Sequence, residues 1–450
     1  MKHNLLAGAA SFALIAGAAH GESHMPFTPG DGDFNWDSYT AFADAHDLSG
    51  KTVNVFGPWR GEDQVLFEGV VAYFEAATGA SVNYASSESY EQQIVIDAEA
   101  GSPPDVGILP QPGLIQNLVS KGFIQPLGED TQTWLGENYA AGDSWVSLGT
   151  FRGPDGTDRL YAFPYKIDVK SLVWYVPENF EDAGYEVPET MEDLKALTEQ
   201  IVAEGETPWC IGLGSGGATG WPATDWVEDM MLRTQPPETY DAWVTNEIPF
   251  TDPAVIGAIE EFGWFIEDGR VAGGRGAVAS TDFRDSPQGL FASPPQCYLH
   301  HQASFIPSFF PKGTQMGVDA DFFYMPAYEG QDLGNPVLGA GTLFFQMTEN
   351  EVGDALIEFL KTPIAHEVWM AQTGFLTPYT AVNTDLYGDG TLKKMGQILL
   401  EATTFRFDGS DLMPAGVGAG SFWTGMVNYA GGKPAAEVAA DIQQSWDALK

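Results

Sequence analysis

The sequence predicts an α/β protein built from two separate units. The chain has 450 residues, about three times the commonest domain size, so we expect more than one hydrophobic core. Candidate strands and helices alternate along the chain, and this alternation restarts near Thr190. Between the two regions lies a continuous apolar run, residues 169–176, which is too long for a loop. We interpret it as a strand that passes from one unit to the other.

The first unit shows a β-α-β-α-β order, which favours a parallel sheet with helices on both faces. Predicted strands cover residues 51–56, 81–86 and 105–109. Apolar residues recur at helical spacing after the first strand until Gly79, and a second helix is predicted over 90–100.

The second unit begins at Thr190-Met-Glu-Asp193, which resembles a capping box and predicts a helix that ends at Gly205. Alternating strands and helices follow it. The predicted strands are 209–213, 297–301, 322–325 and 335–345, and the predicted helices include 226–232, 254–265 and 355–372.

Composition and charge limit the possible partners. Hydrophobic residues make up 44% of the chain, so the chain can bury a core and is not disordered. With 20 Lys and Arg against 62 Asp and Glu, the formal net charge is −42. This charge repels phosphate backbones and anionic membranes, so it argues against a nucleic-acid or membrane partner. A neutral or cationic small molecule is more compatible with this negative charge.

The first residues have the three parts of a secretory signal peptide. Met1 to Asn4 is basic, Leu5 to Gly17 is apolar, and small residues follow. We expect a signal peptide over 1–21, cleaved between about Ala18 and Glu22, then an extension over 22–50. The mature protein should be soluble and periplasmic.

The two cysteines fit an oxidising compartment. An even pair in an exported protein predicts one disulfide, Cys210–Cys297. His300 and His301 lie near Cys297, but adjacent histidines on a strand point to opposite faces, which disfavours a metal site. We expect no metal and no cofactor.

A glycine-rich segment, Gly212 to Gly217, matches the dinucleotide fingerprint formally. Gly220, Trp221 and Pro222 separate it from the next helix, and no acid ends a following strand, so the wider context of that fingerprint is missing. The segment is better interpreted as a loop whose backbone approaches a ligand closely, or as a turn without a ligand.

Carboxylate pairs carry little information in so acidic a chain. Asp225 and Asp229 lie one helical turn apart, but nothing in their spacing shows the separation that a glycosidase needs. The sequence has no Gly-x-Ser-x-Gly and no His-Glu-x-x-His motif.

Three tryptophans are more informative. Trp59 follows a predicted strand, Trp221 follows the glycine loop, and Trp423 lies in a glycine-flanked segment. Ligands bind at the carboxyl ends of strands in α/β sheets, and an indole stacks on the apolar face of a sugar ring. Each could instead pack in a core. We predict a neutral disaccharide held between Trp59 and Trp221.

Several segments together resemble the extracytoplasmic solute-binding proteins of carbohydrate ABC importers. These segments are 98–106, 160–165 with 172–175, 184–190, 339–343 with 359–363, and 374–378. Four others resemble the alpha-glucoside-binding proteins of alphaproteobacteria: 56–63, 209–217, 300–304 and 405–411.

The resemblance implies a two-lobed clamp of type II, with a mostly parallel sheet flanked by helices in each lobe and several crossing strands between them. The lobes would comprise 51–163 with 335–378, and 164–334 with 379–450. It also implies a monomeric binder, not an enzyme, that delivers a maltose-, sucrose- or trehalose-like sugar to a membrane permease.

Matching the motifs residue by residue gives a set of expected ligand-binding positions. They are Trp59, Arg60, Glu62, Tyr90, Gln111, Asp168, Gly217, Trp221, His301, Gln302, Gly341, Arg406 and Trp423. Two alternatives stay open: a periplasmic glycoside hydrolase, and the same clamp with a non-sugar solute such as a polyamine.

Overall fold

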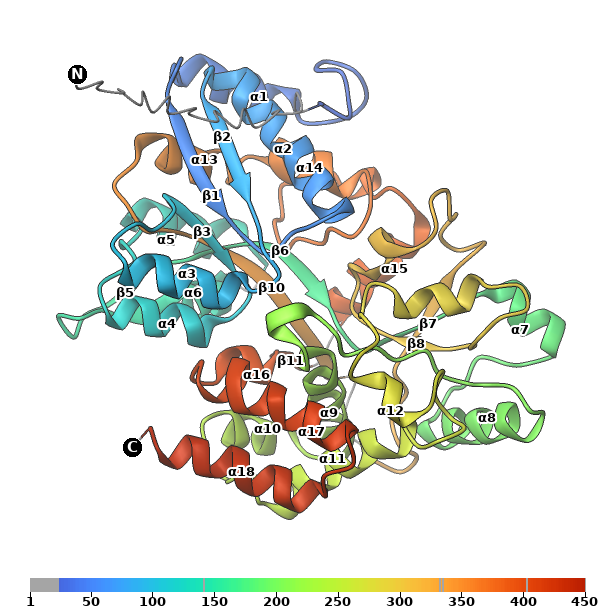
Figure 1. The fold of residues 1–450 in the computed structure, drawn as a ribbon. Helices are drawn as coiled ribbons and strands as arrows, with labels where there is room; N and C mark the ends of the chain where they lie inside the picture. Colours follow the sequence, from blue (N-terminus) through green and yellow to red (C-terminus); the bar gives the residue numbers. More distant parts are fainter. Residues whose placement is uncertain (1–23, 141, 332, 334–335, 402–403, 450) are drawn as a thin grey trace, which may run out of the picture.

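The protein folds into two α/β lobes around a central sheet (Figure 1). The computed structural model describes residues 24–140, 142–331, 333, 336–401 and 404–449. The predicted signal peptide lies outside these residues. No helix in these ranges is long and apolar enough to cross a bilayer.

The central sheet has the order β11-β10-β3-β1-β2, and β6 also pairs with β10. Parallel pairing joins β1 to β2, β1 to β3 and β10 to β11, while β10 runs antiparallel to β3 and β6. The strands are β1 Thr52–Phe56, β2 Ser81–Ala85, β3 Val106–Leu109, β6 Phe163–Val169, β10 Pro336–Gln346 and β11 Thr404–Phe407. The first three strands confirm the predicted parallel order.

Helices cover this sheet and form the first lobe (Figure 1). They are α1 Trp36–Ala45, α2 Glu62–Thr78, α3 Tyr90–Glu99, α4 Pro112–Ser120, α5 Glu129–Asn138, α6 Gly142–Gly149, α13 Glu351–Leu360 and α14 Pro363–Met370, beside the hairpin β4 Thr150–Arg152 and β5 Asp158–Leu160. The N-terminal extension is part of this packing, because the Phe42 ring of α1 lies 5.1 Å from that of Phe359.

The second lobe is mainly helical. Its helices are α7 Pro177–Ala183, α8 Met191–Ala203, α9 Trp221–Thr234, α10 Pro237–Val244, α11 Pro253–Phe265, α12 Arg275–Val278, α16 Gly409–Leu412, α17 Trp423–Ala430 and α18 Ala435–Asp447, and α15 Gly390–Glu401 lies near the junction of the lobes. Helix α8 begins with the predicted capping box, in which Thr190 and Asp193 exchange hydrogen bonds of 3.0 and 3.2 Å.

The sheet of the second lobe differs from the expectation of mostly parallel pairing. Its strands, β8 His300–His301, β7 Leu172–Tyr175 and β9 Asp321–Tyr324, pair antiparallel in the order β8-β7-β9. The predicted strand 209–213 makes only single parallel bridges at Trp209. A Cβ at Gly212 would lie 2.7 Å from the Thr281 carbonyl oxygen, so this backbone packs tightly against a neighbouring loop instead of continuing a ladder.

The chain crosses between the lobes at Lys170 and Ser171, which join β6 to β7. The predicted continuous strand is therefore broken, and Ser171 adopts a left-handed φ of 66° at the break. One hydrophobic cluster draws on residues 42–167 and 344–379, and another on 173–338 and 413–446. Both clusters join segments that are far apart in the sequence, and β11 of the predicted second lobe joins the central sheet. The boundaries themselves stay a prediction.

The predicted disulfide is present. Cys210 and Cys297 are bonded, and their Cα atoms lie 5.6 Å apart. His300, beside them, is buried, and its Nδ1 lies 2.8 Å from the Cys210 carbonyl oxygen.

Candidate functional site

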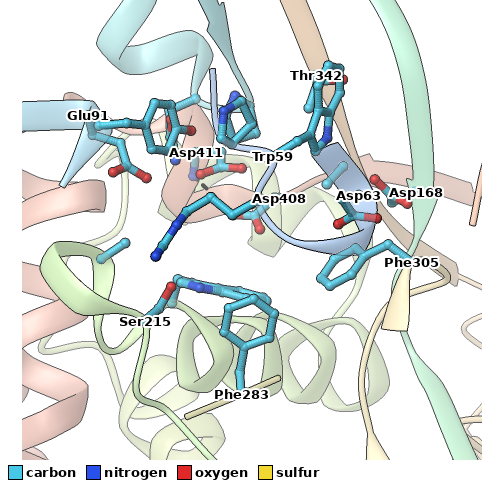
Figure 2. Close-up of a pocket in the computed structure, with 18 of the residues that line it drawn as sticks. Trp59, Asp63, Glu91, Asp168, Ser215, Phe283, Phe305, Thr342, Asp408 and Asp411 are labelled. Carbon is cyan, nitrogen blue, oxygen red and sulfur yellow. Dashed lines mark hydrogen bonds between the residues drawn. The ribbon is translucent and has the colours of Figure 1, made fainter. Parts of the chain in front are cut away.

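A cleft between the lobes is lined by residues from both. Its empty volume, including the open mouth, is about 1020 Å³. The wall combines segments that follow β1, β2 and β3 with the crossing strands and the second-lobe loops. Figure 2 shows Trp59 and Thr342 above the cavity and Ser215, Phe283 and Phe305 below it.

The aromatic residues of the wall are of two kinds. Trp59 is 5% exposed, and its ring packs 4.7 Å from Phe67 and 5.2 Å from Trp369 in the first-lobe core. Trp221 is partly exposed at the start of α9, with its ring 4.9 Å from that of Phe283. Both line the same cavity, but Trp221 has more free surface on which a ligand could stack.

A charged row lies along the crossing strand. Lys166, Asp168 and Lys170 alternate with apolar residues, so all three point to one face of the strand, toward the cleft. Lys166 Nζ contacts both Asp168 carboxylate oxygens, at 2.7 and 2.9 Å. Ser304 Oγ donates to Asp168 Oδ1 at 3.0 Å. Sequence analysis missed both lysines, although this alternation of charges within a buried strand would have indicated them.

Near this pair, Asp63 links the two lobes. It stands in the first turn of α2, and its Oδ1 accepts a hydrogen bond of 2.8 Å from Ser308 Oγ in the second lobe. Burial raises the pKa of Asp63 to about 6, against the opposing effects of Lys166 and the Ser308 hydrogen bond. We call Asp63, Lys166, Asp168, Ser304 and Ser308 the paired end of the cleft.

The other end of the cleft gathers carboxylates. We call Glu91, Asp408 and Asp411 the acidic end; Figure 2 shows them on the side opposite Asp168. The buried Lys170 bridges Asp408 and Asp225, with its Nζ 2.6 Å from Asp225 Oδ1.

Charge interactions at and beside the acidic end shift the pKa values of the carboxyl groups in different directions. Burial and mutual repulsion raise the pKa values of Asp225, Glu228 and Asp411. Burial also acts on Asp408, but Lys170 and local hydrogen bonds outweigh it and lower the pKa of that group. Asp225, Glu228 and Asp408 lie close enough to hold a metal ion together, but Lys170 Nζ already contacts two of them.

Several polar atoms of the cleft wall make no hydrogen bond within the described part of the chain. They are the Tyr90 hydroxyl, Glu91 Oε2, Gln111 Oε1, Thr342 Oγ1 and Trp423 Nε1. Burying such groups unpaired costs about 1–3 kcal/mol each, so the wall is built to meet a polar ligand.

Eight of the thirteen predicted positions line the cleft. They are Trp59, Arg60, Tyr90, Gln111, Asp168, Trp221, Gly341 and Trp423. Their contact with a ligand stays a prediction. The lining residues that sequence analysis missed include Asp63, Glu91, Lys166, Lys170, Phe283, Arg284, Phe305, Asp408 and Asp411. Asp408 and Asp411 belong to the segment 405–411, whose resemblance to the alpha-glucoside-binding group had singled it out, so the signal was present.

The other five predicted positions do not line the cavity. Glu62 is exposed at the start of α2, and Arg406 pairs with Asp241 at 2.6 and 2.8 Å. His301 is buried, with Nε2 3.3 Å from Asp229 Oδ2, and Gln302 Oε1 accepts from the Ala303 N–H. The polar groups of Arg406, His301 and Gln302 therefore have partners outside the cleft.

Gly217 holds a contact between the lobes. Its N–H donates to the Glu88 carbonyl oxygen at 2.9 Å, and a Cβ there would lie 2.7 Å from Ser89 Oγ. The predicted close backbone approach at the glycine loop therefore exists in this structure, but the surface approached is the segment before α3.

Comparisons with known proteins agree with this architecture. The model of the family described as bacterial extracellular solute-binding protein matches residues 60–282. A relative from Rhizobium meliloti, the alpha-glucosides-binding periplasmic protein AglE, is 68% identical over the full length of both chains. This chain belongs to that family of extracellular solute-binding proteins.

More distant relatives share the fold. The osmoprotective compounds-binding protein GgtB of Synechocystis is 39% identical over 88% of this chain and 92% of its own length. The solved structure of the solute receptor AcbH matches with a TM-score of 0.76 at 16% identity, covering 89% of this chain and 99% of AcbH. A chitin oligosaccharide binding protein matches with a TM-score of 0.74 at 19% identity, covering 88% and 98%. The two-lobed solute-binding fold is thus confirmed, and members of this family bind solutes rather than convert them.

Proposed function

We propose that this protein binds alpha-glucosides outside the cytoplasm and delivers them to the permease of an ABC importer. The observation that carries the proposal is full-length identity of 68% to an alpha-glucosides-binding periplasmic protein. The chemistry of the cleft supports it. Partly exposed aromatic rings such as Trp221 suit the C–H faces of a sugar, and the unpaired polar atoms suit its hydroxyl groups.

The proposed mechanism is closure of the lobes on the sugar. A ligand that contacts both walls stabilises the closed state more than the open state, and the permease would recognise the closed state. Two hydrogen bonds join the walls directly, Ser308 to Asp63 and Gly217 to Glu88. We propose that they form on closure and that the chain acts as a monomer in the periplasm after removal of residues 1–21.

Titration calorimetry with maltose, sucrose and trehalose tests the proposal. At least one of them should bind in the micromolar range or tighter, with one site per chain. Spermidine serves as the non-sugar control, and a nitrophenyl alpha-glucoside should not be hydrolysed. If none of these disaccharides binds, the alpha-glucoside assignment is wrong even though the family is established.

The wall residues offer a matched pair for the same experiment. Trp221→Ala removes a partly exposed ring in the cleft, whereas Trp264→Ala removes a partly buried ring on α11 outside it. Only the first substitution should weaken sugar binding. Equal effects of both substitutions would contradict stacking on Trp221.

A further inference from the structure

The cations that line the cleft all have anionic partners. Arg60 contacts Glu88 at 3.1 Å, Arg284 contacts Asp282 at 3.3 Å, Lys166 contacts Asp168, and Lys170 contacts Asp225 and Asp408. None of these four cations is left free to balance a further carboxylate.

Two carboxylates of the acidic end have no such partner. Glu91 is 6% exposed, and its Oε2 makes no hydrogen bond within the described residues. Asp411 is also 6% exposed, and Lys170, whose Nζ contacts Asp225 and Asp408, acts on its carboxylate only through a longer-range attraction. Both groups line the same cavity. Burying uncompensated charge of this kind is costly.

Among the polar atoms near these carboxylates, the Gln111 carbonyl oxygen can only accept a hydrogen bond, and the Tyr90 hydroxyl can accept as well as donate. The Gln111 carbonyl oxygen and the Tyr90 hydroxyl oxygen also lack hydrogen-bond partners within the described residues. Both side chains line the same cavity as Glu91 and Asp411. A sugar hydroxyl supplies one donor, whereas a protonated amine supplies three donors, a positive charge and no acceptor. The acidic end therefore matches an ammonium group better than a hydroxyl group.

We infer that the acidic end of the cleft holds a protonated amino group, so that amino-substituted glycosides bind more tightly than the corresponding neutral glycosides. This rests on the proposed function, because it assigns one end of the same sugar cleft. Burial raises the pKa of Glu91 to about 7, which is expected of a carboxyl group that has no cation beside it. The net charge of −42 also attracts a cationic ligand over a neutral one.

Calorimetry on the full mature chain tests this inference. The ligands are trehalose, maltose and the monoamino-deoxy derivatives of each, in which one hydroxyl at a time is replaced by an amino group. One derivative should bind at least roughly tenfold more tightly than its parent, because a charge-assisted hydrogen bond is about twice as strong as a neutral one. Derivatives with the amine elsewhere on the ring should bind no better than the parent.

Glu91→Gln keeps the shape of the side chain and removes its charge. It should abolish the preference for the amino derivative, so that the ratio of the two affinities falls to about one whatever happens to the affinity for the neutral parent. Glu99→Gln is the matched control, because Glu99 lies on the same helix α3 but pairs with Lys121 outside the cleft. That control should retain the full preference. Asp411→Asn is a second variant with the same expected result if Glu91→Gln does not fold.

The outcomes separate this inference from the proposed function. If a parent sugar binds and none of its amino derivatives binds more tightly, the amine site is wrong and the sugar site stands. If an amino derivative binds and neither parent does, the amine site is supported and the neutral-sugar assignment fails. If no ligand of the series binds, both are wrong.

Discussion

The buried charged side chains at the two ends of the cleft have different partners. At the paired end, Lys166 neutralises Asp168, and Ser308 hydrogen-bonds to Asp63. At the acidic end, Lys170 is shared between Asp225 and Asp408, while Glu91 and Asp411 have no cation of their own. The side chains of the paired end therefore bind one another. Glu91 Oε2 at the acidic end makes no hydrogen bond within the described residues, which is why we place recognition of the amino group there.

Removing Lys170 should disrupt the acidic end most. Lys170→Met leaves Asp225 and Asp408 buried without their shared cation, and breaking a buried pair in this way costs roughly 3–5 kcal/mol of the free energy of unfolding. Urea denaturation measures the change. Lys393→Met, which removes an exposed lysine paired with Asp385, should change stability by less than about 1 kcal/mol. Similar losses in both variants would contradict the role given to Lys170.

The two tryptophans test whether the cleft wall binds or merely packs. Because Trp59 is almost fully buried among aromatic rings, Trp59→Ala should lower the free energy of unfolding by roughly 3–5 kcal/mol. Trp221→Ala should mainly weaken sugar binding, by about 2–4 kcal/mol, since its ring is partly exposed in the cavity. Thermal denaturation and calorimetry on both variants measure the two effects. If Trp59→Ala mainly weakened sugar binding and Trp221→Ala mainly lowered stability, Trp59 would be the ligand-binding residue and Trp221 the packing residue.

The acidic end should also make stability depend on pH. Burial raises the pKa of Glu91 from 4.5 to about 7, so folding favours its protonated form. The resulting stabilisation is fully present below about pH 4.5 and is lost as the pH rises through 7.

Glu91→Gln cannot titrate at this position. The free energy of unfolding of the variant relative to the parent should therefore rise by about 3 kcal/mol between pH 4.5 and pH 8. Denaturation at a series of pH values without ligand measures this difference. A difference that stays constant across the range would show that Glu91 is not buried as a protonated acid.

The smallest effect is expected at the paired end. Ser308→Ala removes one hydrogen bond between the lobes and should weaken sugar binding by about 1 kcal/mol, or roughly fivefold, if that bond forms only on closure. Ser280→Ala, which removes an exposed serine hydroxyl bonded within its own loop, is the control. An unchanged affinity in Ser308→Ala would mean that the bond does not contribute to closure.

Local patterns predicted much of the first lobe. Strands β1, β2 and β3 and the helix α3 lie within one or two residues of their predicted bounds. A glycine or proline follows β1, β3 and α3 within two residues, and such stops and the hydrophobic period act over a few residues. The strand expected over 209–213 failed because its glycines pack against the loop at Thr281, a contact that no local pattern reveals.

The sequence alone determined the two α/β units, the disulfide pairing and the sugar-binding family, because these depend on periodicity, compartment and ordered motifs. Only the tertiary structure decided which polar residues face the cleft. His301 and Arg406 look as suitable for a ligand as Asp168 does, yet Asp229 and Asp241 satisfy them elsewhere. Glu91 and Asp411 are 320 positions apart in the sequence and line the same cavity only in the folded chain, so the surroundings of these two carboxylates are a property of the fold.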